Sequence, residues 1–131
     1  TTESGAKHPR RSVIRRPKGK EELQEEARQA ASALPSLERK WGALRRFKVQ
    51  EILRIGLQDL VGRQPLAGIT EELSNLADVI LEAAYQICHA ELVERHGAPQ
   101  FLDDLGRVRA CPFVILGLGK LGGRELNFSS D

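Results

Sequence analysis

The sequence predicts an α+β protein, mostly helical, in which a long helical part leads into one strand and a glycine-rich turn. Three observations support this fold class. Apolar residues recur at three- and four-residue steps over most of residues 20–95, as in amphipathic helices. Aromatic residues make up 5% of the chain, which favours an aliphatic, helix-rich core. The apolar run 113–116 lies between Pro112 and Gly117, and its length and β-branched content predict a buried strand.

Charge is distributed unevenly along the 131 residues. The net charge is +2, but residues 1–20 carry seven Lys or Arg against a single Glu, which is +6 and leaves −4 for residues 21–131. The basic character therefore belongs to a tail, and we expect the folded part not to bind nucleic acid. No apolar run approaches the roughly 18 residues of a membrane helix, so a soluble protein without membrane contact is expected.

Residue usage also indicates the setting of the protein. The chain has no methionine and begins at Thr1, so we expect a processed chain or a piece of a longer one. A hydrophobic signal core is missing at the amino end. Cys88 and Cys111 are too few for a disulfide scaffold, which favours a reducing, cytoplasmic location, and both are expected to be buried.

The first two expected helices cover residues 20–33 and 37–61. Pro35 should end the first helix, Ser36 should cap the second, and Gly42 could divide it. The second helix has one stripe expected to face the core and one face expected in solvent. The stripe consists of Val49, Ile52, Leu53, Gly56 and Leu60, and the solvated face of Arg45, Arg46, Lys48, Glu51 and Arg54.

A third helix is expected over residues 71–95. Thr70 is placed to cap its amino end, and Gly97 is placed to end it. His89 and His96 are seven residues apart and could share a face as a metal pair. Because the sequence offers no third ligand, surface or helix-end histidines are the favoured interpretation.

Residues 97–111 are expected to form a loop that leads to the strand. Asp103 and Asp104 lie within it and are assigned to solvent. Adjacent side chains point apart on a regular element, so these two carboxylates do not by themselves form a shared site.

The glycine turn after the expected strand permits competing interpretations. Residues 117–122 match G-x-G-x-x-G, the fingerprint of dinucleotide-binding folds, in which backbone approaches a pyrophosphate. The long helix, second strand and later acid that would confirm such a fold do not follow in the sequence. A Walker loop is excluded because Lys120 precedes Leu121 and not Ser or Thr. A glycine turn of purely structural use is a further alternative.

Another interpretation treats the strand, the turn and the final Ser-Ser-Asp as one nucleotidyl-transfer unit. In that chemistry divalent ions bridge the phosphates of a nucleotide and are held by carboxylates after the glycine turn. Two carboxylates on one face of a strand require a spacing of two residues. Asp131 would be the first of such a pair, with its partner expected beyond the last residue.

The same residues carry a family resemblance. The run Phe113 to Asp131, with Lys-Leu-Gly-Gly-Arg-Glu-Leu at 120–126, resembles the bifunctional glutamine-synthetase adenylyltransferase/adenylyl-removing enzymes. These enzymes are members of the DNA polymerase β-like nucleotidyltransferase superfamily. Its pattern is a hydrophobic residue, Gly-Gly or Gly-Ser, a spacer and Asp-x-Asp or Asp-x-Glu. Gly117-Leu118 and Asp131 fit that spacing, although Leu118 replaces the usual small residue. The resemblance extends over about residues 42–131, including the helices.

The sequence is expected to divide into three parts, and the resemblance implies a set of roles for residues of the last part. Residues 1–19 would be a basic disordered tail or linker, 20–111 a helical region, and 112–131 the incomplete start of a nucleotidyltransferase catalytic domain. Asp131 would be the catalytic Mg²⁺ ligand. The nucleotide-binding residues would be Gly117, Gly119, Lys120, Gly122, Gly123, Ser129 and Ser130. For Lys120 the alternative is a surface lysine without a role in binding. Arg124 and Glu125 are expected to be an exposed pair.

The activity implied by the resemblance is removal of AMP from a tyrosine of glutamine synthetase by phosphorolysis, or addition of AMP from ATP. Residues 126–131 are more similar to the amino-terminal, adenylyl-removing half of the family. The implied partners are glutamine synthetase, a PII signal protein, ATP or ADP, and phosphate. We expect these 131 residues alone to be inactive, since one carboxylate does not hold two metals. A dinucleotide-binding domain and a non-catalytic helical interaction module are the alternatives.

Overall fold

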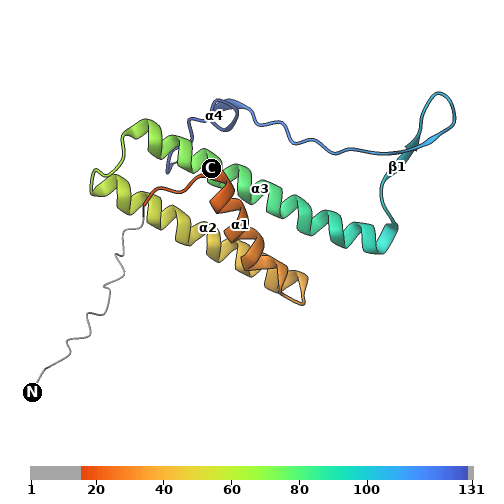
Figure 1. The fold of residues 1–131 in the computed structure, drawn as a ribbon, viewed down its shortest axis with the longest axis horizontal. Coiled ribbons are helices and arrows are strands. Elements are labelled where there is room, and N and C mark those ends of the chain that lie inside the picture. Colours follow the sequence, from red (N-terminus) through yellow and green to blue (C-terminus); the bar gives the residue numbers. More distant parts are fainter. Residues whose placement is uncertain (1–15, 130–131) are drawn as a thin grey trace, which may run out of the picture.

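The computed structural model describes residues 16–129, and its core is a bundle of three helices. The chain runs through α1 (Lys20–Ser32), α2 (Leu37–Leu60) and α3 (Leu66–His96). It then forms a hairpin of β1 (Gln100–Leu102) and β2 (Val108–Ala110) and ends its regular structure with α4 (Gly119–Gly122). Figure 1 shows the hairpin beyond the end of α3 and the chain returning along α3 to α4. The expected mostly helical α+β class is confirmed.

Local sequence signals explain where the helices begin and end. Ser36 caps α2, since its side-chain oxygen accepts from the backbone N–H of Arg39 at 3.3 Å. Gly97 ends α3 with φ 81° and donates its N–H to Val93 O at 2.8 Å, as predicted. The third helix starts at Leu66, earlier than expected, and its N-cap residue is Pro65 and not Thr70. Gly42 does not divide α2, which is continuous.

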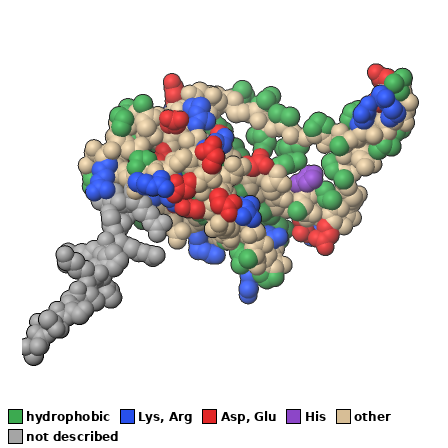
Figure 2. Space-filling model, in the orientation of Figure 1, with side chains coloured by type: hydrophobic (Ala, Val, Ile, Leu, Met, Phe, Trp, Pro, Cys, Tyr) green, Lys and Arg blue, Asp and Glu red, His purple; other side chains and the backbone are tan. Residues whose placement is uncertain are grey.

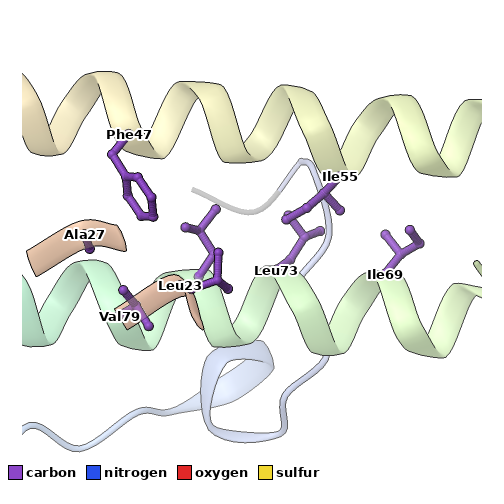
Figure 3. Close-up of a cluster of buried hydrophobic side chains, with 8 residues drawn as sticks. Leu23, Ala27, Phe47, Ile55, Ile69, Leu73 and Val79 are labelled. Carbon is purple, nitrogen blue, oxygen red and sulfur yellow. The ribbon is translucent and has the colours of Figure 1, made fainter. Parts of the chain in front are cut away.

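The hydrophobic core lies where all three helices meet. Figure 3 shows side chains of α1, α2 and α3 pointing toward one another. Leu23 and Ala27 of α1 contribute to the same cluster as Ile55 of α2 and Val79 of α3. Burying one leucine or isoleucine side chain contributes about 1.5–3 kcal/mol, so this cluster is a principal source of the bundle's stability. The other buried members of the cluster are Phe47, Ile69, Leu73 and Leu76.

The prediction for the two faces of α2 was right in part: Arg45, Arg46 and Lys48 are exposed, and Ile52 packs against the core cluster. Val49, Leu53 and Leu60, expected in the core, are 65%, 61% and 83% exposed. Glu51 and Arg54, expected in solvent, are buried. The buried face of α2 therefore carries charged residues beside Phe47 and Ile55 of the core cluster, and these charged residues belong to a polar cluster that an apolar count does not detect.

That polar cluster is a buried ion-pair network of Lys18, Glu51, Arg54 and Glu72. Lys18 Nζ lies 2.8 Å from Glu51 Oε1, and Arg54 Nε lies 2.7 Å from Glu51 Oε2. Arg54 Nη2 also pairs with Glu72, which accepts from the backbone N–H of Lys18 at 2.8 Å. Lys18 belongs to the segment expected to be a solvated tail, but it is 6% exposed because these carboxylates hold it. The network therefore connects the residues before α1 to α2 and α3.

Residues 97–111, predicted to be a loop, contain the antiparallel hairpin, with Phe101 opposite Arg109. Asp103, predicted to lie free in solvent, instead organises the turn. Its carboxylate accepts the backbone N–H groups of Leu105 at 3.0 Å and Arg107 at 2.9 Å. It also pairs with the Arg107 and Arg109 side chains at 2.9 and 3.0 Å. The hydrogen bond from the Arg107 backbone, followed by those from the arginine side chains, lowers the pKa of Asp103.

We predict that Asp103→Asn loosens the hairpin, because an amide oxygen accepts these hydrogen bonds more weakly than a carboxylate. Since the folded pKa is lowered, the contribution of Asp103 is present above the ordinary value of 3.8 and is lost as pH falls through the folded value. Amide exchange of Cys111, which donates to Pro99 O at 3.0 Å, measures this. Asp104→Asn is the matched control, and equal exchange in the two variants would contradict the assignment.

The strand predicted at residues 113–116 is not a strand in the structure. The segment has no regular secondary structure, and Phe113, Val114 and Leu116 are 65%, 69% and 81% exposed. A strand needs a neighbouring backbone to complete its hydrogen-bond ladder. The sheet of residues 16–129 consists of β1 and β2 alone, so this run has no partner there. Figure 2 shows hydrophobic side chains along the stretch between the hairpin and the bundle.

Other residues with predicted environments are mostly at the surface. Cys88 and Cys111 were expected to be buried, and both are exposed. His96 is exposed at the end of α3, and His89 contacts the Tyr85 ring with centroids 5.3 Å apart. Within residues 16–129 no group of three His, Cys, Asp or Glu side chains could hold a metal ion. No helix in this part of the chain is long and apolar enough to cross a membrane.

Candidate functional site: the glycine turn and its support on α3

The glycine turn lies against the middle of the bundle, where the returning chain reaches α3 (Figure 1). Residues 112–118 lead into α4, a single helical turn. Four backbone hydrogen bonds close the turn on itself, the first from Gly122 N–H to Leu118 O at 3.3 Å. Gly123 N–H donates to Gly119 O at 2.9 Å, Arg124 N–H to Leu121 O at 3.1 Å and Glu125 N–H to Lys120 O at 2.8 Å. The turn is therefore a compact unit.

Two glycines are required by the shape of this unit. Gly119 has φ 58°, in the left-handed region that glycine adopts at little cost. Gly122 faces Gly117 so closely that a Cβ at residue 122 would lie 2.4 Å from Gly117 O. No side chain is tolerated there without moving backbone. The turn thus brings Gly117 and Gly122 together, while the predicted approach of phosphates to these glycines stays a prediction.

Gly122→Ala is predicted to open the turn, because its methyl group meets backbone and not a flexible side chain. Overpacking of this kind costs about 1–3 kcal/mol. Amide exchange at Glu125 should accelerate accordingly. Gly123→Ala is the control, since its added Cβ would lie 3.3 Å from Gly119 O at an ordinary φ of −78°. Equal acceleration in both variants would show that the Gly117 contact is unimportant.

Polar residues of α3 anchor the chain that leaves the turn. Arg124 and Glu125 are both exposed, as expected, but the Arg124 guanidinium also donates to Asn75 Oδ1 and lies 3.3 Å from Asp78 Oδ2. Two residues later, the Leu126 N–H lies 3.4 Å from Ser74 Oγ, and the Leu126 side chain packs against the core cluster. The segment after the turn is therefore fixed on one face of α3.

A second contact holds the same segment on α2. The Phe128 ring lies 3.6 Å from the position that a Cβ on Gly56 would occupy. The absence of a side chain at Gly56 thus gives an aromatic ring access to the helix, where a close helix–helix approach was expected. The segment 124–128 consequently rests on both long helices.

A cavity of about 530 Å³ lies between α1, α3 and the turn. Both signs of charge line it: Lys20 and Arg124 are cationic, and Asp78 and Glu82 are anionic. Asp78 already pairs with Lys20 at 2.7 Å and with Arg124. The charges facing this cavity are therefore largely balanced from within the protein.

The remaining predicted site residues are less constrained. Lys120 is exposed and forms no ion pair among the described residues. Ser129 Oγ donates to Asn127 Oδ1 at 3.0 Å and is exposed. Ser130 and Asp131 lie outside the described residues, so their predicted roles are untested.

Sequence reasoning did not identify Ser74, Asn75 and Asp78 as supports for the site. A signal for the first two was present. The apolar stripe of the third helix is interrupted by polar residues on its buried side, and Ser74 and Asn75 are 0% and 9% exposed. Buried polar side chains need partners. Ser74 Oγ donates to Thr70 O within α3 and accepts from Leu126 N–H, and Asn75 accepts from Arg124.

Comparison with known proteins identifies the family. A family model described as glutamate-ammonia ligase adenylyltransferase matches residues 7–131. The chain belongs to this family. Two curated family members are named bifunctional glutamine synthetase adenylyltransferase/adenylyl-removing enzyme. The one from Alteromonas mediterranea is 42% identical over 89 residues, 68% of this chain and 8% of that protein. The one from Thioalkalivibrio sulfidiphilus is 44% identical over 88 residues, 67% of this chain and 9% of that protein.

The chain therefore spans less than a tenth of the length of these family members. No solved structure matches it. The resemblance deduced from the glycine turn is confirmed at the level of the family.

Proposed function

We propose that this chain is part of an enzyme that moves AMP groups onto or off glutamine synthetase, which is also called glutamate-ammonia ligase. The observation that carries the proposal is the glycine turn within a chain that matches the adenylyltransferase family over residues 7–131. The turn leaves no room for a side chain at Gly122, and Arg124, which follows the turn, donates to Asn75 of α3. Such a surface suits close approach of a nucleotide's phosphates.

The favoured direction is adenylyl removal, on the resemblance of residues 126–131 to the adenylyl-removing half of the family. In this reaction an oxygen of inorganic phosphate forms a bond to the phosphorus of the AMP group. The bond from that phosphorus to the tyrosine oxygen breaks, the oxygen takes up a proton, and ADP is released. Addition of AMP from ATP is the opposite modification. A PII signal protein is the proposed regulatory partner.

Mg²⁺ would be held by Asp131 and would neutralise phosphate charge during the transfer. The described residues do not supply a metal site of their own, since Asp78, the aspartate anchoring the turn, is paired with Lys20 and Arg124. Lys120 is the proposed charge partner of a phosphate, and Ser129 and Ser130 its hydrogen-bond donors. Gly117, Gly119, Gly122 and Gly123 form the turn.

A dinucleotide-binding domain is disfavoured by the geometry after the turn. Such a domain needs a long helix starting at the glycines. The helix here, α4, ends at Gly122 after four residues, and Arg124 then adopts a left-handed conformation. The helical interaction module has an observation in its favour, because the exposed apolar residues 113–116 could contact a partner.

Nucleotide binding distinguishes the transferase from the interaction module. Calorimetric titration of the full-length protein with ADP or ATP should show binding that strengthens in the presence of Mg²⁺ and disappears with a chelator. An Arg109→Ala variant in the distant hairpin is the control and should bind equally well. Absence of metal-dependent nucleotide binding in the wild-type protein would favour the interaction module and contradict the proposal.

A further inference from the structure

Arg124 has an unusual backbone conformation. Its φ is 59°, and among the described residues it is the only non-glycine with a positive φ. It directly follows Gly122 and Gly123, and glycine at position 124 would adopt the same conformation without steric cost. An arginine at such a position needs a compensating role for its side chain.

The side chain of Arg124 has a defined set of partners. Its Nη2 donates to Asn75 Oδ1, and its Nη1 lies 3.3 Å from Asp78 Oδ2. Asn75 is 9% exposed and so cannot rearrange freely, and Asp78 is fixed further by Lys20 of α1 at 2.7 Å. Residues 75 and 78 are one helical turn apart and present both acceptors on one face. The guanidinium thus spans two fixed points on α3.

This contact determines how the chain leaves the turn. Leu126 follows within two residues, with its N–H against Ser74 Oγ and its side chain on the core. Phe128 then rests against Gly56. Ser129 comes next, so the path from Arg124 to the proposed phosphate-binding residues is short and supported throughout.

We infer that Arg124 is a positioning residue, whose contact with Asn75 and Asp78 sets the segment 125–129 against the phosphate site. The inference rests on the proposed function. Arg124 acts through α3 and not by touching the nucleotide. Glycine at position 124 would relieve the backbone but release the segment, so activity should fall while global stability changes little.

The test uses the full-length protein with Arg124→Gly, Arg124→Lys and the pair Asn75→Ala/Asp78→Ala. AMP removal from adenylylated glutamine synthetase gives kcat and KM. Arg124→Gly should lower kcat about 10–100-fold, the scale of a misplaced reacting group, and leave KM for glutamine synthetase within twofold. Arg124→Lys, which lacks the planar fork, should recover only part of the loss. The thermal unfolding midpoint of Arg124→Gly should stay close to that of the wild type, because relief of the left-handed backbone offsets the lost side-chain contacts.

A double-mutant cycle separates positioning from direct contact. In the Asn75→Ala/Asp78→Ala background, Arg124→Gly should reduce kcat by less than a further twofold. If the losses in kcat from the two sets of substitutions multiply, Arg124 contacts the substrate itself. If Arg124→Gly has the kcat of the wild type, Arg124 has no role in positioning. Either result overturns the inference. Arg109→Ala, another arginine paired with an aspartate, is the control and should be unchanged.

A separate variant, Asp131→Asn, tests the proposed function itself. If Asp131→Asn is inactive while Arg124→Gly is fully active, the inference fails and the proposed function stands. If Asp131→Asn retains all activity, the proposed function fails. Amide exchange of residues 124–128 should accelerate in Arg124→Gly with α2 and α3 unchanged, and unchanged exchange in this segment would also overturn the inference.

Discussion

Replacing Arg54 with alanine is expected to lower the free energy of unfolding by about 3–5 kcal/mol, the cost of breaking a buried ion pair by removing one partner. Arg54 lies between Glu51 and Glu72, and all three side chains are at most 8% exposed. Without the guanidinium, Glu51 keeps an ion pair with Lys18, whose ammonium also pairs with Glu26, and Glu72 keeps only hydrogen bonds from the Lys18 backbone and the Gln64 side chain. Either water then enters the bundle or one of the carboxylates becomes protonated, and both outcomes cost free energy.

Denaturant unfolding of the 131-residue chain, followed by the helical circular dichroism signal, measures this effect. Arg28→Ala is a matched control, because Arg28 pairs with Glu25 at 2.7 Å on the same bundle but in solvent. Its unfolding midpoint should stay near that of the wild type, since exposed pairs contribute little. Equal midpoints for Arg54→Ala and Arg28→Ala would contradict a stabilising role for the network.

The sequence predicted the helices better than their buried faces. Pro35, Ser36 and Gly97 are local signals, and they located the helix ends correctly because capping depends on nearby residues. The inward face of α2 depends on partners distant in sequence. Glu51 and Arg54 are buried because Lys18 and Glu72 reach them, which no periodicity of apolar residues reveals.

The sequence predicted the glycines of the candidate site but not the residues of α3 that hold the segment after it. Gly119 and Gly122 were identifiable because their requirement is local to the turn. The strand expected before them was not confirmed, since a strand depends on a neighbouring backbone. Asn75 and Asp78 were missed because 49 and 46 residues separate them from Arg124. The family resemblance was recognisable from the turn because that short run carries its most specific residues.

We propose that the glycine turn introduces a nucleotidyl-transfer site in which Asp131 binds Mg²⁺. The most direct test is Asp131→Asn in the full-length protein, with removal of AMP from glutamine synthetase and addition of AMP measured side by side. An amide is a much poorer Mg²⁺ ligand than a carboxylate. Even supporting residues around a metal contribute about 10–100-fold, so loss of a ligand should reduce one activity by at least about 100-fold.

The other activity should remain, because the resemblance places it in a separate half of the enzyme. Asp104→Asn, in the hairpin turn, is the control and should retain both activities. Loss of adenylyl removal with retained addition is the result we predict for Asp131→Asn. Full retention of both activities would contradict the assignment of Asp131 and, with it, the nucleotidyl-transfer role of the turn.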